Sequence, residues 1–290
     1  MKKSLFILIL ALIAYPAMAQ LLWRISGNGL KQPSYLFGTH HLIPISFLDS
    51  VPGLYKAFNA SEMIIGEMIL SDLDATATMQ KAAVMPNHIK MKDLLDEQDY
   101  QLVDAELKRV LKMGLSDLSI LNPSLILTLY EMEIYKQLTG FSDDIKSDSY
   151  FQLVGSEKGK KMLGLETIQQ QIALLFENGT LQRQANLLVA SINQKETALN
   201  EMLHLNKLYR TGAIDEMVLH AKKSGDFSQL TEAEYTKIVD DRNAEWLNKL
   251  PAQMQASGCF IAVGALHLGG DKGVVKLLQK AGFKVAAVSK

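Results

Sequence analysis

The stretch "YLFGTHHLIP" (Tyr35–Pro44) is an apolar run that stops at a glycine and is followed at once by two histidines. A second stretch near the other end of the chain, "FIAVGALHLGG" (Phe260–Gly270), repeats this arrangement. In both, a strand-like run ends in Gly-x-x-His, and the histidines are His41 and His267. Because functional side chains gather where the strands of an α/β sheet end, the pattern predicts that the two ends of the chain meet in one sheet.

Apolar periodicity along the rest of the chain supports this arrangement. Strand-like runs cluster toward the two ends, and segments with apolar residues three and four apart fill the middle. We therefore expect an α/β (α+β) fold, in which a central mixed β-sheet is built from both chain ends and covered by helices. The first two strands should form a hairpin. The expected strands are 21–27, 34–40, 62–68, 160–167, 258–263 and 283–288, and the expected helices are 46–60, 73–84, 91–113, 122–138, 182–210, 214–224, 231–256 and 271–281.

The first nineteen residues have the features of a signal peptide. Lys2 and Lys3 precede the apolar run Leu5–Tyr15, and small residues lead up to Ala19. We expect cleavage near Ala19 and an exported protein, periplasmic or secreted, with no stable membrane span afterwards. An uncleaved N-terminal anchor is the alternative.

Composition limits the remaining possibilities. Residues 20–290 contain no Pro- or Ser-rich linker, which predicts a single domain. The chain has 30 basic and 31 acidic residues and a formal net charge of −1, so nothing favours binding to nucleic acid or to an anionic membrane surface. Cys259 is the only cysteine, which excludes an internal disulfide.

Four polar side chains follow strand-like runs: His41, Glu67, Glu166 and His267. Imidazole is the commonest protein ligand for divalent transition metals, and two histidines with one carboxylate leave a coordination position open for water. The pattern therefore indicates a hydrolytic metal site. Buried histidines that simply cap a turn, or acid–base groups that act without a metal, would give the same pattern. His40 adjoins His41, and because side chains alternate along a strand we expect His41 to face the site.

Glu67 and a pair of residues in a helical segment carry charge or hydrogen-bonding capacity near this edge. Glu67 ends the otherwise apolar run "EMIIGEM" (62–68), and a carboxylate beside a buried strand needs a partner or a metal. Arg242 and Asn243 lie in "DDRNAEW" (240–246), inside a helical pattern from which they could reach over the sheet edge. An exposed polar helix face is the alternative for this pair.

The chain resembles the TraB/GumN family, which includes the animal Tiki proteins, metal-dependent proteases that act on Wnt. The resemblance covers nearly all of residues 20–290. It implies a mixed sheet wrapped by helices, related to the erythromycin-esterase and haem-binding ChaN folds. It rests on the blocks "LLWRISGNGLKQPSYLFGTHHL", "IIGEM", "SDSYFQLVGSEKGKKMLGLETIQQQ", "DDRNAEWLNKL" and "FIAVGALHLGGDKGVVKLLQKAGFKV".

Individual positions match the family pattern. They are Gly38 and His41, Gly264 and His267, Glu67, the Leu165–Thr167 block with Gln171, and the pair Arg242 and Asn243. The resemblance implies that the two histidines and Glu67 lie at one sheet edge, and for the animal members it implies a manganese- or cobalt-dependent peptidase. The sequence contains no His-Glu-x-x-His helix motif.

These observations lead to one functional expectation and one alternative. We expect an exported metal-dependent hydrolase, a peptidase acting on a peptide or protein substrate, in which His41, Glu67 and His267 hold a divalent metal ion (Mn, Co or Zn) that activates water. A non-catalytic protein that binds a peptide or haem in the same pocket is the alternative. Glu67 or Glu166 would serve as general base, and Arg242 or Asn243 would bind the oxyanion.

Overall fold

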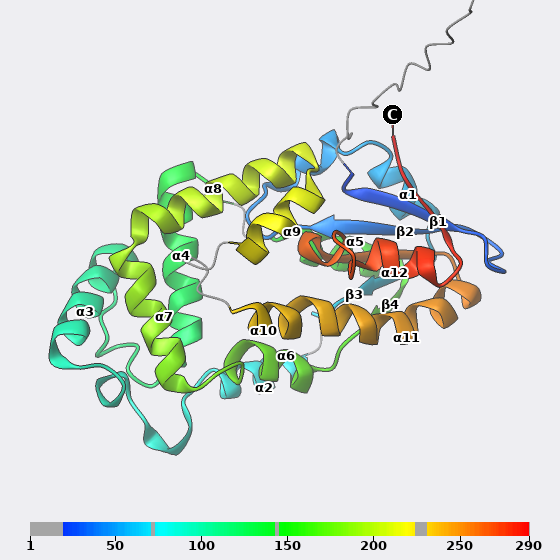
Figure 1. The fold of residues 1–290 in the computed structure, drawn as a ribbon. Coiled ribbons are helices and arrows are strands. Elements are labelled where there is room, and N and C mark those ends of the chain that lie inside the picture. Colours follow the sequence, from blue (N-terminus) through cyan, green and yellow to red (C-terminus); the bar gives the residue numbers. More distant parts are fainter. Residues whose placement is uncertain (1–19, 71–72, 143–144, 224–230, 290) are drawn as a thin grey trace, which may run out of the picture.

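The computed structural model describes residues 20–70, 73–142, 145–223 and 231–289 (Figure 1). The predicted signal peptide lies outside these residues. In the described part of the chain, no helix combines the length and the apolar character that a membrane crossing requires. The strands found there are β1 (Leu22–Ser26), β2 (Ser34–Thr39), β3 (Met63–Gly66), β4 (Lys161–Gly164), β5 (Cys259–Gly264) and β6 (Lys284–Ala287).

The six strands form one mixed sheet in the order β4-β3-β5-β2-β1-β6. Strand β5 pairs in parallel with both β2 and β3, and β4 pairs in parallel with β3. Strands β1 and β2 form the predicted antiparallel hairpin, and β6 pairs antiparallel with β1. The sheet is therefore built from both ends of the chain, as the two Gly-x-x-His runs predict. Because four neighbouring strands are parallel, the residues that follow β2, β5, β3 and β4 emerge at one edge.

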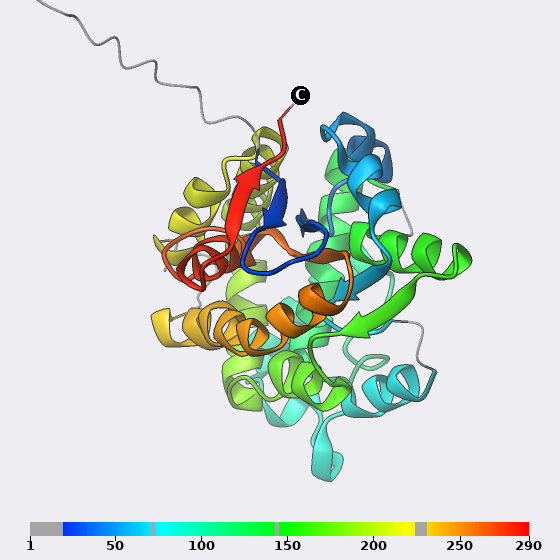
Figure 2. The same ribbon diagram turned by 90° about the vertical axis from the view of Figure 1, so that its right-hand side faces the viewer.

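Helices cover both faces of this sheet (Figure 2). Helices α1 and α5 lie on one face, where Phe151 of α5 packs against Phe37 of β2 with ring centroids 5.5 Å apart. Helices α11 and α12 lie on the other, and Trp246 and Leu250 of α11 are fully buried in the sheet core. The helix bounds are α1 (Leu54–Ala60), α2 (Leu73–Ala82), α3 (Glu97–Leu111), α4 (Pro123–Thr139), α5 (Ser147–Glu157), α6 (Ile168–Phe176), α7 (Leu181–Asn193), α8 (Lys195–Thr211), α9 (Ile214–Lys223), α10 (Glu232–Tyr235), α11 (Asp241–Ala256) and α12 (Val274–Lys280).

A second hydrophobic core lies away from the sheet, between α3, α4 and α7 (Figure 1). Val103 and Leu107 of α3, Tyr130 of α4 and Leu188 of α7 belong to it and are almost completely buried. Helix α4 begins where Asn122 accepts a hydrogen bond from the backbone N–H of Ser124, with Pro123 at the first helical position. This capping pattern fixes the start of α4.

Several helix predictions are wrong in their bounds. The expected helix 46–60 is a 3₁₀ turn (Ile45–Ser50) followed by α1, because Pro52 and a left-handed Gly53 interrupt it. The expected helix 182–210 is two helices, α7 and α8, which meet at Gln194. Helices α5 and α6 were not expected. The prediction of a single domain over residues 20–290 stays a prediction.

Candidate active site

The ends of three parallel strands bring polar side chains together. Glu67 follows β3, Glu166 follows β4, and His267 ends the 3₁₀ turn Ala265–His267 that follows β5. The backbone N–H of Glu166 donates to the carbonyl of Glu67 at 2.8 Å, which extends the pairing of β3 and β4 past their last residues. The backbone N–H of Gly264 donates to Oε1 of Glu67 at 2.8 Å. The register of the strands therefore fixes the backbone positions from which Glu67, Glu166 and His267 extend.

A helix from the other side of the edge supplies the central group, Arg242. The first turns of α11 follow a π-helical turn at Thr236–Asp240, a type of turn often found at functional sites. The Arg242 guanidinium donates from Nε and Nη2 to the two oxygens of Glu166, at 2.6 and 3.0 Å, and from Nη2 to Oε2 of Glu67 at 2.5 Å. Its Nη1 lies 3.1 Å from Nε2 of His267. Two carboxylates and one imidazole therefore converge on one guanidinium.

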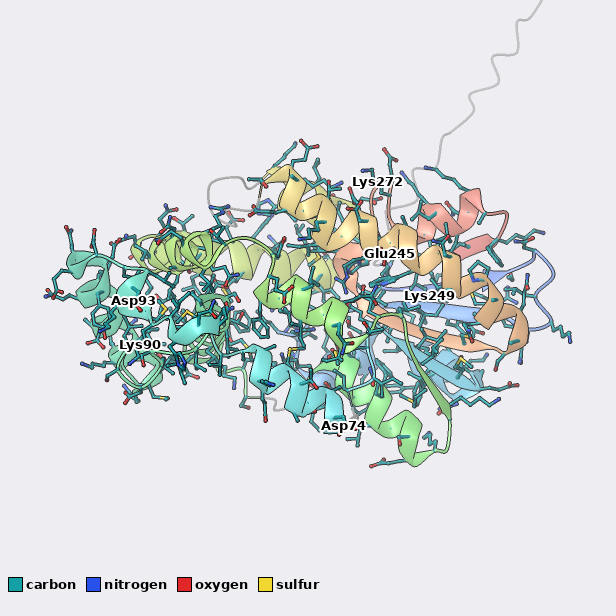
Figure 3. All side chains as sticks on the ribbon, turned by 90° about the horizontal axis from the view of Figure 1, so that it is seen from below. Asp74, Lys90, Asp93, Glu245, Lys249 and Lys272 are labelled. Carbon is teal, nitrogen blue, oxygen red and sulfur yellow. The ribbon has the colours of Figure 1, made fainter. Side chains whose placement is uncertain are left out.

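Glu166 is the anchor of this cluster. Its side chain is 4% exposed, and besides Arg242 it accepts hydrogen bonds from Nε1 of Trp246 at 2.8 Å and from Nε2 of Gln171. The same loop is also tied to α11, because Lys249 donates from Nζ to the carbonyl of Leu165. Figure 3 shows the position of Lys249 on this helix. Both carboxylate oxygens of Glu166 thus have two donors each, which accounts for its burial as an anion.

His267 is held in a defined tautomer. Its Nδ1 lies 2.7 Å from Oδ1 of Asn243, whose own amide donates to the carbonyls of His267 and Lys272. Since an amide oxygen only accepts, Nδ1 carries the proton and Nε2 presents its lone pair toward Arg242. Burial, opposed by the negative charge of Glu67 and reinforced by the positive charge of Arg242, lowers the pKa of His267 to about 4. The imidazole is therefore neutral at pH 7.

Glu67 is the part of the cluster that reaches solvent, since its side chain is 28% exposed. Burial raises its pKa, but electrostatic interactions with His267 and Arg242 and the hydrogen bonds from Gly264 and Arg242 outweigh burial and lower it to about 2. We attribute this lowering chiefly to Arg242, because a neutral His267 adds little charge. Glu67 is therefore an anion that faces water.

The structure places the paired histidines after β2 differently from this cluster. The His40 ring lies 5.0 Å from that of Tyr209, its Nδ1 accepts the backbone N–H of Leu42 at 3.0 Å, and burial lowers its pKa to about 4. The His41 side chain is 57% exposed, and its Nε2 lies 3.6 Å from Asp148 at the start of α5. His40 thus turns inward, and His41 emerges at the sheet edge outside the contacts that join the other five predicted residues.

A metal ion would find two suitable donors here. His267 has the arrangement of a metal-binding imidazole, with one nitrogen fixed by Asn243 and the other presenting a lone pair, and Glu67 is an adjacent anion. Within the described residues, no three His, Cys, Asp or Glu side chains already converge on one point. Glu67 and His267 therefore fit a divalent cation, whereas His41 would have to turn its exposed side chain to join them.

The relationship of this chain to known proteins is given by a protein-family model. The model of the TraB/PrgY/gumN family matches residues 21–287, nearly the whole chain. The chain belongs to this family. No curated protein and no solved structure matches the chain. In this TraB/PrgY/gumN family member, the match spans all six strands and every residue of the cluster.

One residue of this cluster was not recognised in the sequence. Trp246 donates to Glu166, and its ring centroid lies 4.4 Å from that of His267 and 4.9 Å from the Arg242 guanidinium carbon. It occurs four residues after Arg242, so the two side chains share a helix face. The four-residue spacing between Arg242 and Trp246 is the sequence feature that could have identified Trp246.

Proposed function

We propose that this protein is an exported metal-dependent hydrolase that acts on peptides. Family membership supports the proposal, and one observation carries it: His267 presents a neutral, oriented imidazole nitrogen beside the solvent-facing anion of Glu67. A purely structural ion cluster would need only Arg242 and its two carboxylates. The fixed tautomer of His267 directs the Nε2 lone pair at Nη1 of Arg242, and a metal ion would take up this lone pair once that contact is released.

Glu67 and His267 would hold a divalent ion (Mn, Co or Zn), and His41, which follows a strand of the same sheet edge, would be the third ligand. The His41 side chain is 57% exposed, so it can change rotamer at little cost. When bound, the ion would lower the pKa of a water molecule so that hydroxide forms near neutral pH. Glu67 stays ionised over the whole physiological range because its pKa is about 2, which suits a ligand.

The remaining residues of the cluster position these groups. Glu166 holds Arg242 through two parallel hydrogen bonds, and Asn243 holds His267, so we assign both as positioning residues. Arg242 is the candidate for binding the oxyanion. Its Nη1 now donates to the carbonyl of Ile238 and faces His267. Release of the contact with His267 would leave one N–H for a substrate oxygen, without disturbing the pairing with Glu166.

The site also favours Glu67 over Glu166 as the carboxylate that meets water. Glu166 is 4% exposed and accepts hydrogen bonds from Arg242, Trp246 and Gln171. Glu67 is 28% exposed, and it is therefore the carboxylate that a water molecule can reach. A low pKa makes Glu67 a weak proton acceptor, so its contribution is chiefly to bind and orient.

A peptide-cleavage assay tests the proposal. The protein lacking residues 1–19 is incubated with a peptide library, with chelator and then with added Mn²⁺, Co²⁺ or Zn²⁺, and the products are identified by mass spectrometry. We expect cleavage only with metal, loss of cleavage in Glu67→Gln and His267→Asn, and normal cleavage in the control His88→Asn, which changes an exposed histidine. Intact peptides under every metal, with peptide or haem still bound, would favour the binding protein instead.

Export is a separate part of the proposal with its own test. Cleavage after Ala19 would leave Gln20 as the first residue. Intact-mass measurement of protein from the native host should then give a chain that lacks residues 1–19. A full-length mass in every cell fraction would contradict export by this route.

A further inference from the structure

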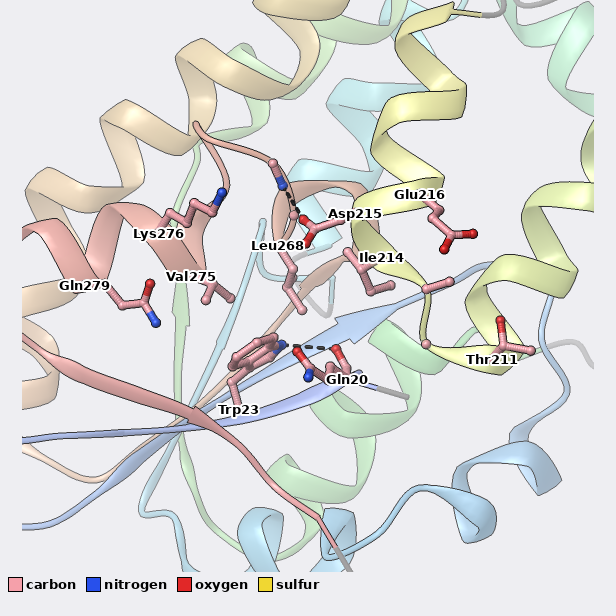
Figure 4. Close-up of a pocket in the computed structure, with 14 residues that line it drawn as sticks. Gln20, Trp23, Thr211, Ile214, Asp215, Glu216, Leu268, Val275, Lys276 and Gln279 are labelled. Atoms are coloured by element: carbon pink, nitrogen blue, oxygen red, sulfur yellow. Dashed lines mark hydrogen bonds between the residues drawn. The ribbon is translucent and has the colours of Figure 1, made fainter. Parts of the chain in front are cut away.

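A cavity of about 420 Å³ lies beside the second Gly-x-x-His loop (Figure 4). It is bounded by β1, by the turn between α8 and α9, by residues 268–270 and by α12. Glu67, Glu166, Arg242 and His267 do not line it, so it is distinct from the ionic cluster. Its volume suits a small organic molecule or the end of a peptide.

The floor of the cavity is apolar. Trp23, Ile214, Leu268 and Val275 face it in Figure 4. The Trp23 indole is held in place because its Nε1–H donates to the carbonyl of Gln20 at 3.0 Å. A fixed aromatic ring among aliphatic side chains can take up an apolar group, and its face also attracts a cation.

The rim of the cavity is acidic. Asp215 and Glu216 stand at the start of α9, and Asp215 uses only Oδ1 in its 2.8 Å hydrogen bond from the backbone N–H of Gly270. Within the described residues, the side chain of Glu216 forms neither a hydrogen bond nor an ion pair, and it is exposed at the start of α9. Lys276 also lines the cavity, where it pairs with Asp271 at 2.7 Å and its charge also interacts with that of Asp215. The cavity therefore offers two carboxylates beside an apolar floor.

We propose that this cavity binds an organic ammonium ion that carries an apolar body. The ammonium group would pair with one carboxylate of the rim, Asp215 or Glu216, and the apolar body would lie on Trp23. A free amine and the amino end of a peptide that starts with an apolar residue share this chemistry. Neutral and anionic molecules of the same shape would lose the ion pair, and an anion would also face two like charges.

The chain provides a direct reporter, because it contains two tryptophans. Trp23 lines the cavity, and Trp246 lies in the ionic cluster. In ¹H–¹⁵N spectra the two indole N–H signals are assigned with Trp23→Phe. Titration with 2-phenylethylamine should shift the Trp23 signal and leave the Trp246 signal in place. 2-Phenylethanol and 3-phenylpropionate should bind at least about tenfold more weakly, since they lack the charge-assisted hydrogen bonds.

The variant Asp215→Asn/Glu216→Gln removes both charges and keeps the acceptor for Gly270. It should weaken binding of 2-phenylethylamine at least about tenfold. The matched control is Glu196→Gln/Glu232→Gln, which removes two exposed charges elsewhere and should bind normally. Equal binding of amine and alcohol, equal binding by both double variants, or a shift of Trp246 alone would overturn the proposal.

The same titration separates the two sources of the ligand. The dipeptide Phe-Ala should bind like the amine if the natural ligand is the amino end of a peptide, and N-acetyl-Phe-Ala should then fail. Binding of 2-phenylethylamine without Phe-Ala would identify a free amine. The result does not depend on peptide cleavage, because neither metal nor Glu67 takes part in it.

Discussion

Replacing Arg242 with Gln tests the ionic cluster. The guanidinium is 12% exposed and compensates Glu166, which is 4% exposed, and Glu67, which is 28% exposed. A unit charge pair about 4 Å apart interacts by about 4 kcal/mol at an effective dielectric constant of 20, and breaking a buried pair costs about 3–5 kcal/mol. We therefore expect Arg242→Gln to lower the free energy of unfolding by about 3–5 kcal/mol, because two carboxylates lose their counter-charge.

Urea unfolding at pH 7, followed by circular dichroism, measures this change. Arg24→Gln, at an exposed position on β1, is the matched control and should change stability by at most about 0.5 kcal/mol. A cycle with Glu67→Gln adds a second test. The double variant should be less destabilised than the sum of the single variants, by about 1–3 kcal/mol, since Glu67→Gln removes one stranded charge. Additive effects, or an Arg242→Gln protein as stable as the control, would refute the reasoning.

Three other changes follow from the same contacts. Because the pKa values of His40 and His267 are lowered from 6.5 to about 4, the unfolded chain binds protons first on acidification. The free energy of unfolding should therefore fall as the pH drops from about 6.5 to about 4, by up to about 3 kcal/mol for each histidine. Urea unfolding at several pH values checks this, and a constant free energy of unfolding would contradict it. Gly66→Ala places a Cβ 2.5 Å from Nε2 of Gln152, whose amide forms hydrogen bonds with the backbone of Met68 and Leu70. We therefore expect the free energy of unfolding to fall by about 1–3 kcal/mol, measured by thermal unfolding. An unchanged midpoint would show that Gln152 moves freely. Asn243→Ala leaves Nδ1–H of His267 without its acceptor and should lower the free energy of unfolding by about 1–3 kcal/mol. The His267 signal in NMR spectra should also change, and an unaltered tautomer would contradict the positioning role of Asn243.

Much of the fold could be predicted because apolar periodicity distinguishes the strands from most helices. The runs around Tyr35–Pro44 and Phe260–Gly270 predict a sheet joined from both chain ends, and this is confirmed. Helix α5 was missed because "SDSYFQLVGSE" is rich in small and polar residues and contains Gly155, which packs against Ile64. The break at Gln194 has no glycine or proline to mark it. In these places tertiary packing decides the structure, and local sequence does not show it.

Five of the six expected site residues lie together, whereas the sixth, His41, lies outside their contacts, and the geometry of the group was not predictable. The expected residues Glu67, Glu166, Arg242, Asn243 and His267 do lie together. Arg242 occupies the centre of the cluster because the π-helical turn before α11 shifts the phase of the helix. This turn leaves no mark in the apolar periodicity of the sequence. The orientation of the two histidines after β2 is likewise set by Tyr209 and Asp148, which are distant in sequence.

Metal binding by matched variants tests the central claim most directly. The protein without residues 1–19 is dialysed against Mn²⁺, Co²⁺ or Zn²⁺, and the bound metal is counted in the unaltered chain and in Glu67→Gln, His267→Asn and His88→Asn. We expect one tightly bound ion in the unaltered chain and in His88→Asn, and loss of that ion in Glu67→Gln and His267→Asn. Equal metal content in all four proteins, or no bound metal in a protein that still cleaves peptides, would contradict it.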